Sequence, residues 1–157
     1  MAFSGKNSCA LRENVNSTNS GKNQNILDKI CIIVHISIMW PINYTPEYED
    51  WFTAQEEENQ MAINAKVLVL SKFGPNLGRP YVDTIQGSKF ANLKELRIKF
   101  KISLFRILFC FDKNRNCWLL IGGNKKGKNE EHFYRRLIKQ AEDLIEKYPE
   151  ITEERDA

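Results

Sequence analysis

Two arginines lie where their side chains could bind one phosphate together. Arg97 and Arg106 belong to two successive apolar runs of the chain. If these runs pair as strands with the arginines opposite each other, the like charges repel unless an anion lies between them. A phosphate would satisfy both groups, because a guanidinium binds phosphate through two parallel N–H donors. The other interpretation is that Arg106 pairs with a carboxylate such as Asp83 or Glu95.

A segment rich in glycine and lysine follows the third apolar run and precedes a predicted helix. It reads Gly122-Gly123-Asn124-Lys125-Lys126-Gly127-Lys128. Glycine lets the backbone approach a ligand closely, and the lysines supply positive charge. The order of residues is neither that of a Walker A loop nor that of a dinucleotide-binding fingerprint. The alternative to a ligand-binding loop is a flexible, solvated one.

Tyr134 lies one turn into the last predicted helix, beside Arg135 and Arg136. It could act on a ligand, or it could lie at the edge of the core with its hydroxyl in water. We expect no pair of carboxylates on the basic face. Neither His35 nor His132 has a recognisable relay partner. Lys, Arg and Tyr side chains would therefore carry any chemistry.

Strand-like runs position these residues. Apolar and basic side chains alternate from Leu96 to Lys101, the period of a strand with one apolar and one basic face. Two further runs, Leu104–Phe111 and Cys117–Ile121, follow after short polar links. The pattern predicts a meander of adjacent strands. We expect the rest of the chain to cover its apolar face.

Helices are predicted before and after this meander along the chain. After a first strand at Met39–Tyr44, Thr45 and Pro46 form a helix start, and a second helix follows the acidic break at residues 56–58 and ends at Gly74. The last helix follows Asn129 as N-cap and ends at Pro149. The order predicts an α+β domain with a mostly antiparallel sheet of about four strands. Two helices would pack as a hairpin on one sheet face.

The long polar connection at residues 76–91 exceeds the usual length of a loop in a compact domain. We therefore consider it a candidate functional loop. Four cysteines lie at positions 9, 31, 110 and 117, without metal-like spacing. This usage favours a reducing cytosol, although a disulfide between Cys110 and Cys117 across a hairpin remains an alternative.

The chain divides by composition into three parts. Residues 1–38 form an extension whose first 29 residues are too polar for a core. The run ICIIVHISI at residues 30–38 is too short to span a bilayer; it is either an extra strand or part of an extension upstream of Met39. Residues 39–149 form the expected domain, and residues 150–157 form a tail.

The net charge of +3 conceals a strong asymmetry. Residues 72–136 contain 15 Lys or Arg and 5 Asp or Glu, a net charge of +10. The acidic segments at residues 44–71 and 137–157 carry net charges of −5 and −4. A concentrated basic region indicates an anionic partner such as nucleic acid. The alternative is a solvated sheet edge protected by Lys and Arg.

Long motifs of the basic region resemble a known family. The runs GPNLGRPYVDTIQGSKFANLKELRIKF, FRILFCFDKNRNCWLLIGGNKKG and HFYRRLI are similar to the HigB-type branch of the RelE/ParE toxin superfamily. The resemblance covers about residues 39–149. It implies a RelE-like domain that cuts mRNA on the ribosome without a metal or other cofactor. It also implies a cytoplasmic protein and a helix-turn-helix antitoxin of HigA type.

The resemblance also implies roles for individual residues. Arg106 would stabilise the transition-state charge, and Arg97 would hold the backbone phosphate or support the fold. Lys125 would neutralise the leaving oxygen or donate a proton, and Tyr134 would stack on a base or transfer a proton. RNA-binding roles fall to the remaining basic residues, namely Lys94, Lys126, Arg135 and Arg136.

Some positions depart from the family pattern. Asn124 stands where Asp is usual, Lys126 where Thr is usual, and Phe105 where Tyr is usual. Lys101-Ile102-Ser103 stands where the family usually has a basic turn that contains glycine. These changes leave open an attenuated toxin or a non-catalytic module that binds RNA or an antitoxin. Inhibition of DNA gyrase, as by ParE, is a third alternative, because one fold supports several functions.

Overall fold

The computed structural model describes residues 39–152 of the protein, and the N-terminal extension lies outside them. Within this range the chain forms a five-stranded sheet in the order β1-β5-β4-β3-β2. The strands are β1 (Ile42–Tyr44), β2 (Val82–Thr84), β3 (Lys94–Phe100), β4 (Ser103–Phe111) and β5 (Cys117–Asn124). β1 runs parallel to β5 and the other pairings are antiparallel. The predicted α+β class is confirmed.

The predicted meander is confirmed as β3, β4 and β5. In the β3–β4 hairpin, Arg97 lies directly opposite Arg106, the arrangement in which the two like charges need an anion between them. The prediction of about four strands misses β2. This strand of three residues lies inside the connection predicted as a loop and pairs with the start of β3. It is too short for its own periodicity to be recognised.

Helices α2 (Pro46–Thr53) and α3 (Glu57–Phe73) follow β1 with the predicted signals. The Thr45 side chain accepts a hydrogen bond from the backbone N–H of Tyr48, satisfying one free donor of the first turn. Gly74, with φ of 55°, is the C-cap of α3. Its positive φ suits glycine, which lacks the Cβ that makes this region costly.

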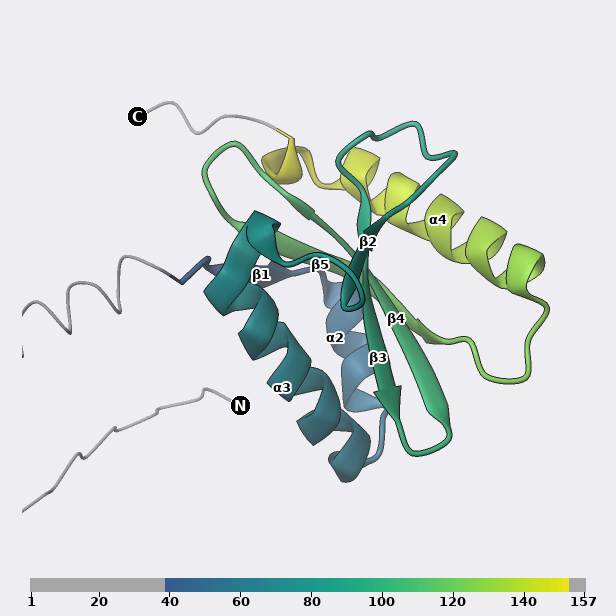
Figure 1. The fold of residues 1–157 in the computed structure, drawn as a ribbon. Coiled ribbons are helices and arrows are strands. Elements are labelled where there is room, and N and C mark those ends of the chain that lie inside the picture. Colours follow the sequence, from purple (N-terminus) through teal and green to yellow (C-terminus); the bar gives the residue numbers. More distant parts are fainter. Residues whose placement is uncertain (1–38, 153–157) are drawn as a thin grey trace, which may run out of the picture. The chain divides into compact units, whose positions relative to one another are not determined.

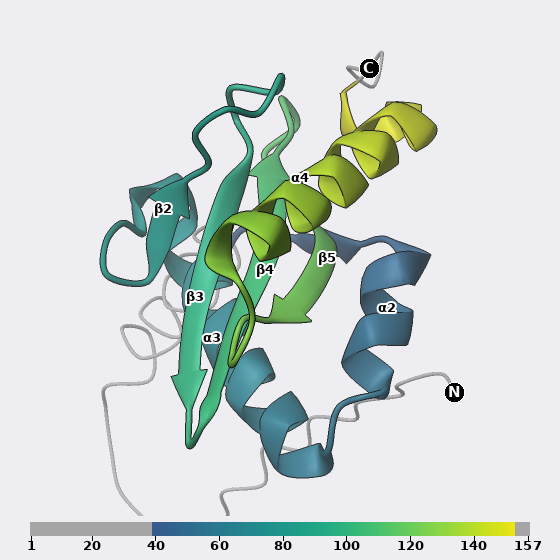
Figure 2. The same ribbon diagram turned by 90° about the vertical axis from the view of Figure 1, so that its right-hand side faces the viewer.

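The sheet is covered on both faces, not only on one as we expected (Figures 1 and 2). Side chains of α2 and α3 pack on one face, in a core that includes Phe105 and Phe109. Helix α4 (Glu130–Lys147) packs on the other face over Leu108 and Cys110. Successive strand residues point to opposite faces. Even-numbered residues of β4 therefore meet α4, and Arg106 points to that side.

Helix α4 begins and ends at the predicted signals. The side chain of Asn129 accepts a hydrogen bond from the backbone N–H of His132. A short 3-10 turn, Pro149–Ile151, follows the helix. Ile151 lies past the expected end of the domain and is buried in the core beneath α4.

The paired glycines of β5 lie within the strand, where they let the helices pack closely, and not in a loop. The strand extends to Asn124, so Gly122 and Gly123 lie inside it. A Cβ added to Gly122 would lie 2.2 Å from Trp51, and one added to Gly123 would lie 3.0 Å from Phe133. Helices of both faces thus approach the strand at these two positions. The interpretation of these glycines as part of a ligand-binding loop is wrong.

Cys110 and Cys117 are buried and unbonded. Cys117 belongs to the core beneath α2 and α3, and Cys110 to the core beneath α4. Because the two thiols lie on opposite faces of the sheet, a disulfide between them is excluded. None of the helices in residues 39–152 is long and apolar enough to cross a membrane.

Candidate active site

Arg106 and Tyr134 meet where β4 passes under the first turns of α4. Arg106 Nε donates a hydrogen bond to the Tyr134 hydroxyl over 3.2 Å, and its Nη1 donates to the Phe105 carbonyl over 2.9 Å. The Arg106 side chain is 13 % exposed, so it is largely buried but still reaches the surface. The family resemblance implied that these two residues act in one site, and the structure places them in contact.

The anion between the two opposed arginines is a residue of the protein itself. Glu95 Oε1 accepts a hydrogen bond from Arg97 Nε at 2.6 Å, and its Oε2 lies 3.7 Å from Arg106 Nε. Glu95 is only 3 % exposed. A buried charge persists only where it is paired, and the two arginines supply that pairing. This matches the carboxylate interpretation of Arg106, with Glu95 as the partner.

Arg97 is held by a second carboxylate as well. Its Nη2 lies 3.1 Å from Asp83 Oδ2, which also pairs with Arg79 Nη2 at 2.8 Å. Asp83 lies opposite Glu95 in the β2–β3 pairing. The Arg79 guanidinium, with help from Arg97, lowers the pKa of Asp83. Strand β2 therefore brings the negative charge of Asp83 to Arg97, and the sequence analysis did not predict this contact.

Lys125 follows β5 and lies beside the same tyrosine. Its Nζ is 5.4 Å from the centroid of the Tyr134 ring and pairs with Glu130. A backbone hydrogen bond of 2.9 Å from Lys125 N–H to the Leu104 carbonyl ties this residue to β4. Arg106, Lys125 and Tyr134 therefore converge from β4, the β5–α4 connection and α4.

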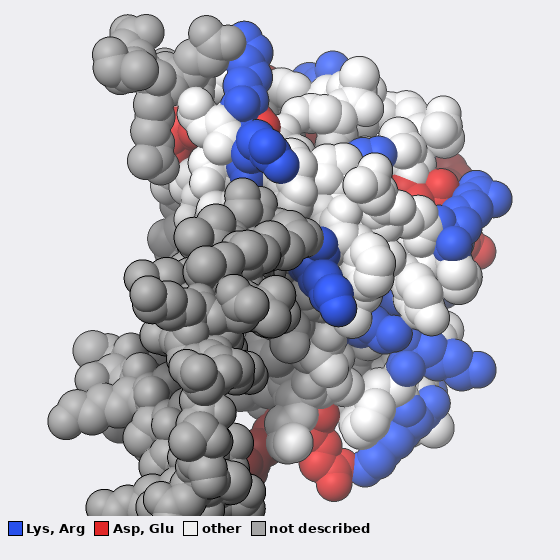
Figure 3. All heavy atoms as spheres, turned by 60° about the vertical axis from the view of Figure 1, so that its left-hand side comes forward, with Lys and Arg blue, Asp and Glu red and all other residues white. Residues whose placement is uncertain are grey.

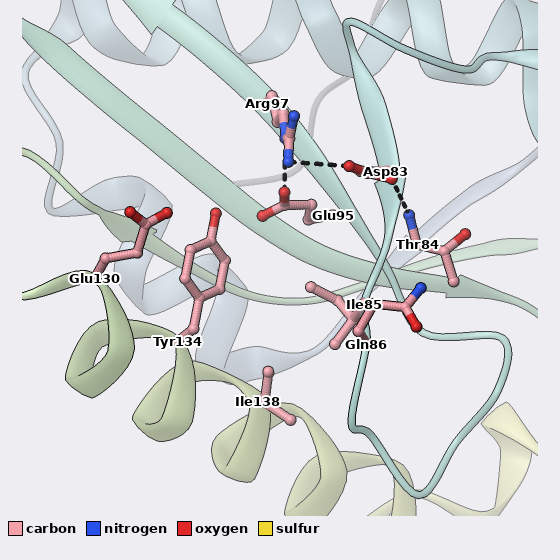
Figure 4. A pocket seen from close by; sticks show the side chains of 9 residues that line it. All are labelled: Asp83, Thr84, Ile85, Gln86, Glu95, Arg97, Glu130, Tyr134 and Ile138. Atoms are coloured by element: carbon pink, nitrogen blue, oxygen red, sulfur yellow. Dashed lines mark hydrogen bonds and ion pairs between the residues drawn. The ribbon is translucent and has the colours of Figure 1, made fainter.

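A pocket of about 250 Å³ opens between β2, β3 and α4 (Figure 4). Figure 4 shows the Glu95 carboxylate between the guanidinium of Arg97 and the hydroxyl of Tyr134. The residues lining the pocket are Asp83, Thr84, Ile85, Gln86, Glu95, Arg97, Glu130, Tyr134 and Ile138. Part of the connection predicted as a functional loop therefore forms one wall.

Burial and the neighbouring Glu95 carboxylate raise the pKa of Tyr134, while its hydrogen bond from Arg106 lowers it by less. The phenol therefore keeps its proton at neutral pH. It can donate a hydrogen bond or a proton to a ligand, but it is a poor proton acceptor.

Comparison with known sequences identifies the family. The model of the family described as "Phage derived protein Gp49-like (DUF891)" matches residues 50–146, more than half of the chain. This protein belongs to the Gp49-like family. The match includes every residue named above in the candidate site.

Two relatives of this Gp49-like chain are proteins of Mycobacterium tuberculosis named "Putative toxin HigB3" and "Putative toxin HigB2". HigB3 is 38 % identical over 103 residues, which are 66 % of this chain and 88 % of the relative. HigB2 is 35 % identical over 120 residues, 73 % of this chain but only 59 % of the relative. The resemblance to HigB-type proteins is confirmed.

Two solved complexes share a weaker likeness with the Gp49-like chain. One is the toxin–antitoxin complex RelBE2 of Mycobacterium tuberculosis, with a TM-score of 0.43 and 10 % identity. The other is the RelE–RelB complex of Pyrococcus horikoshii, with a TM-score of 0.44 and 10 % identity. The matches cover 55 % and 57 % of this chain and 99 % of each solved chain.

The other predicted RNA-binding residues of this Gp49-like protein lie around the site rather than in it. Lys126, Arg135 and Arg136 are exposed, and Arg135 pairs with Glu131 one turn away. Lys94 Nζ donates a hydrogen bond to Thr84 Oγ1 at 3.1 Å and does not line the pocket. Figure 3 shows basic side chains spread over one face of the molecule and separated by uncharged ones.

The expectation that the basic face carries no pair of carboxylates is wrong. Glu95 and Asp83 come from the paired strands β3 and β2, and Glu130 comes from the first turn of α4. One signal in the sequence pointed to Glu95. In KELRIKF it has the same parity as Arg97 and therefore lies on the same strand face. The position of Asp83 depends on the register of β2 against β3, and that of Glu130 depends on where α4 lies on the sheet. No local sequence pattern predicts either.

Proposed function

We propose that this protein is the toxin of a toxin–antitoxin pair and acts as a ribosome-dependent endoribonuclease. The observation that carries the proposal is the convergence of Arg106, Lys125 and Tyr134 beside one pocket. Membership of the Gp49-like family and similarity to the HigB proteins support it.

The reaction we propose needs only groups of the protein and of the RNA. The ribose 2′-oxygen attacks the adjacent phosphorus and the bond to the 5′-oxygen breaks, which leaves a 2′,3′-cyclic phosphate. The 2′-hydroxyl gives its proton to a non-bridging oxygen of the phosphate, and the leaving 5′-oxygen gains one from Lys125. Rate enhancement comes from holding the reacting atoms in line and from stabilising the charge that develops on the phosphate oxygens.

Each residue has a role that its surroundings permit. Arg106 stabilises the phosphate charge of the transition state, because its guanidinium reaches the surface beside Tyr134. Lys125 neutralises the leaving oxygen or gives it a proton. Tyr134, which remains protonated at neutral pH, donates a hydrogen bond or stacks on a base. Arg97 is a supporting residue, because two carboxylates already hold it.

The partners we propose are the ribosome with its mRNA and a helix-turn-helix antitoxin of HigA type. Exposed Lys126, Arg135 and Arg136 contact RNA phosphates at the rim of the site. The place of action is the cytoplasm, where ribosomes and messages meet. A small helix-turn-helix protein encoded in the neighbouring reading frame would support the pair.

One observation favours a second candidate, a binding module that holds RNA without cutting it. Arg97, Arg106 and Lys125 each lie beside a carboxylate of the protein, so part of the charge offered to a phosphate is already neutralised. Such a module would bind RNA with a steep salt dependence and leave messages on ribosomes intact.

The two candidates are separated by controlled expression of the full chain in growing bacteria. The toxin arrests growth and produces new 5′ ends in mRNA, and Arg106→Ala lowers cleavage by about 10²–10³-fold. Lys139→Ala, which removes an exposed cation of α4 that pairs with Asp143 and does not line the pocket, is the matched control. Normal growth with intact messages would refute the endoribonuclease.

A further inference from the structure

Glu95 is a buried carboxylate whose oxygens are not available to a ligand. It is 3 % exposed, and its Oε2 is buried without a hydrogen-bond partner in the described part of the chain. Its Oε1 accepts a hydrogen bond of 2.6 Å from Arg97 Nε. A buried charge is costly unless other charges pair with it. Any effect of Glu95 on a reaction at the surface must therefore pass through the side chains that it holds.

A row of alternating charges crosses β2, β3 and β4 on the side of the sheet that carries α4. Asp83 Oδ2 lies 3.1 Å from Arg97 Nη2, and Glu95 follows next in the row beyond Arg97. Glu95 and Arg106 are diagonal neighbours across the hairpin, a spacing of about 7–8 Å that long side chains can bridge. Glu95 Oε2 lies 3.7 Å from Arg106 Nε. One carboxylate therefore lies between two guanidinium groups that would otherwise repel each other.

Three contacts fix the guanidinium of Arg106. Its Nε donates to the Tyr134 hydroxyl, its Nη1 donates to the Phe105 carbonyl, and the charge of Glu95 attracts it. At 3.7 Å the contact with Glu95 is longer than a hydrogen bond, so Glu95 occupies none of the donors of Arg106. Within residues 39–152, Arg106 Nη2 donates no hydrogen bond. The guanidinium is therefore oriented while one of its donor groups stays available to a phosphate oxygen.

We infer that Glu95 is a positioning residue that orients Arg106 for the transition state, an inference that rests on the proposed cleavage of RNA. Its charge offsets the repulsion between the two opposed arginines. It attracts the Arg106 guanidinium from the side of β3 and leaves Nη2 for the phosphate. A guanidinium fixed in advance stabilises the developing charge without reorganising during the reaction. Glu95 itself touches neither the RNA nor the reacting atoms.

Cleavage kinetics with the purified full-length protein on translating ribosomes test this role. Glu95→Gln preserves the size of the side chain and removes its charge. It should lower kcat by about 10–100-fold with little change in KM, because it displaces a group that acts in the transition state. Glu146→Gln is the matched control, since Glu146 pairs with Lys89 on the last turn of α4 and does not line the pocket. An unchanged kcat for Glu95→Gln would overturn the inference.

A double-mutant cycle separates positioning from a general role in the fold. In the Arg106→Ala background, Glu95→Gln should lower kcat by less than about twofold, because residues that act as a unit are not additive. If Glu95→Gln does not fold, Glu95→Asp takes its place in the same cycle. It keeps the charge on a shorter side chain, so it should lower kcat several-fold with Arg106 present and hardly at all without it. With either variant, equal losses in both backgrounds would overturn the inference.

Hydrogen exchange of the Arg106 Nε–H distinguishes failure of this inference from failure of the proposed function. This proton is hydrogen-bonded to Tyr134, so nuclear magnetic resonance should show slow exchange in the wild type and faster exchange in Glu95→Gln. Messages cut equally by both proteins, with unchanged exchange, would refute the positioning role and leave the endoribonuclease intact. Faster exchange in a variant of a protein that cuts no message would keep Glu95 as the residue that orders Arg106 and refute the endoribonuclease.

Discussion

Asp112 is the residue that fixes the turn between β4 and β5. Its carboxylate accepts hydrogen bonds from the backbone N–H and the side-chain amide of Asn116, at 2.8 Å and 2.7 Å, and from Trp118 Nε1 at 3.0 Å. Burial alone would raise the pKa of Asp112, but these hydrogen bonds lower it below its ordinary value. The folded protein therefore binds this proton less tightly than the unfolded chain.

Asp112→Asn should reduce the free energy of unfolding by about 1–3 kcal/mol at neutral pH. Because the pKa of Asp112 is lowered on folding, its contribution is complete above the unfolded pKa of about 3.9 and is lost as pH falls through the lower folded value. Urea unfolding of wild type and variant from pH 7 to pH 3 measures the difference. A difference that stays constant or grows towards pH 3 would contradict this explanation.

Residue by residue, the site was predicted in part. Arg97, Arg106, Lys125 and Tyr134 were named from the alternation of charges and from the family motifs, and all four lie at or beside the pocket. Glu95 was missed as a site residue because a carboxylate among arginines was considered only as a partner of Arg106. Its burial depends on α4, which folds over the strand from 35 residues later in the chain.

At the scale of elements, β5 separates the two helical layers at a pair of glycines. Trp51 of α2 lies over Gly122 on one face, and Phe133 of α4 lies over Gly123 on the other. The closeness of these contacts determines how near both helices come to the sheet. Tyr134 follows Phe133 directly, so this packing also sets the position of the site.

Gly122→Ala should destabilise the protein by about 1–3 kcal/mol, because its Cβ would lie 2.2 Å from Trp51 and force the indole to move. Thermal unfolding followed by circular dichroism measures the change. Gly78→Ala is the matched control, since no atom lies within 4 Å of a Cβ built there. Equal melting temperatures for the Gly122 variant and wild type would show that the layers are not closely packed.

Long elements were predicted from sequence more fully than short ones. The caps of α2 and α4 and the Gly74 C-cap of α3 gave the helix limits, and strict alternation gave β3. Strand β2 was missed because its three residues show no period. The glycine pair was assigned to a loop because only tertiary contacts reveal which helix lies over each residue.

At the scale of the whole molecule, the charge asymmetry of the sequence is distributed over the folded surface. The strands and loops of residues 72–136 hold most of the basic groups, while α4 adds acidic ones along its later turns. Ion pairs such as Lys89–Glu146 and Lys147–Glu47 join distant segments at the surface. At the rim of the site, Lys126 and Arg136 are exposed, and Arg135 beside them pairs with Glu131.

Simultaneous substitution of Lys126, Arg135 and Arg136 by alanine should weaken RNA binding uniformly across sequences. Removal of one phosphate-binding cation should reduce the slope of log K against log salt by about 0.7 for single-stranded RNA, so the three substitutions together reduce it by about 2. Fluorescence anisotropy from 50 to 300 mM salt, a range of about sixfold, measures the slope. A slope equal to that of wild type would remove these residues from the RNA interface.

The most direct test of the central claim uses translating ribosomes and a defined mRNA in vitro, with purified full-length protein. We predict cleavage by the wild-type protein with a 2′,3′-cyclic phosphate at the new 3′ end, and a loss of about 10²–10³-fold for an Arg106→Ala variant that retains the wild-type melting curve. An uncut message, or equal cleavage by the folded Arg106→Ala variant, would contradict the claim.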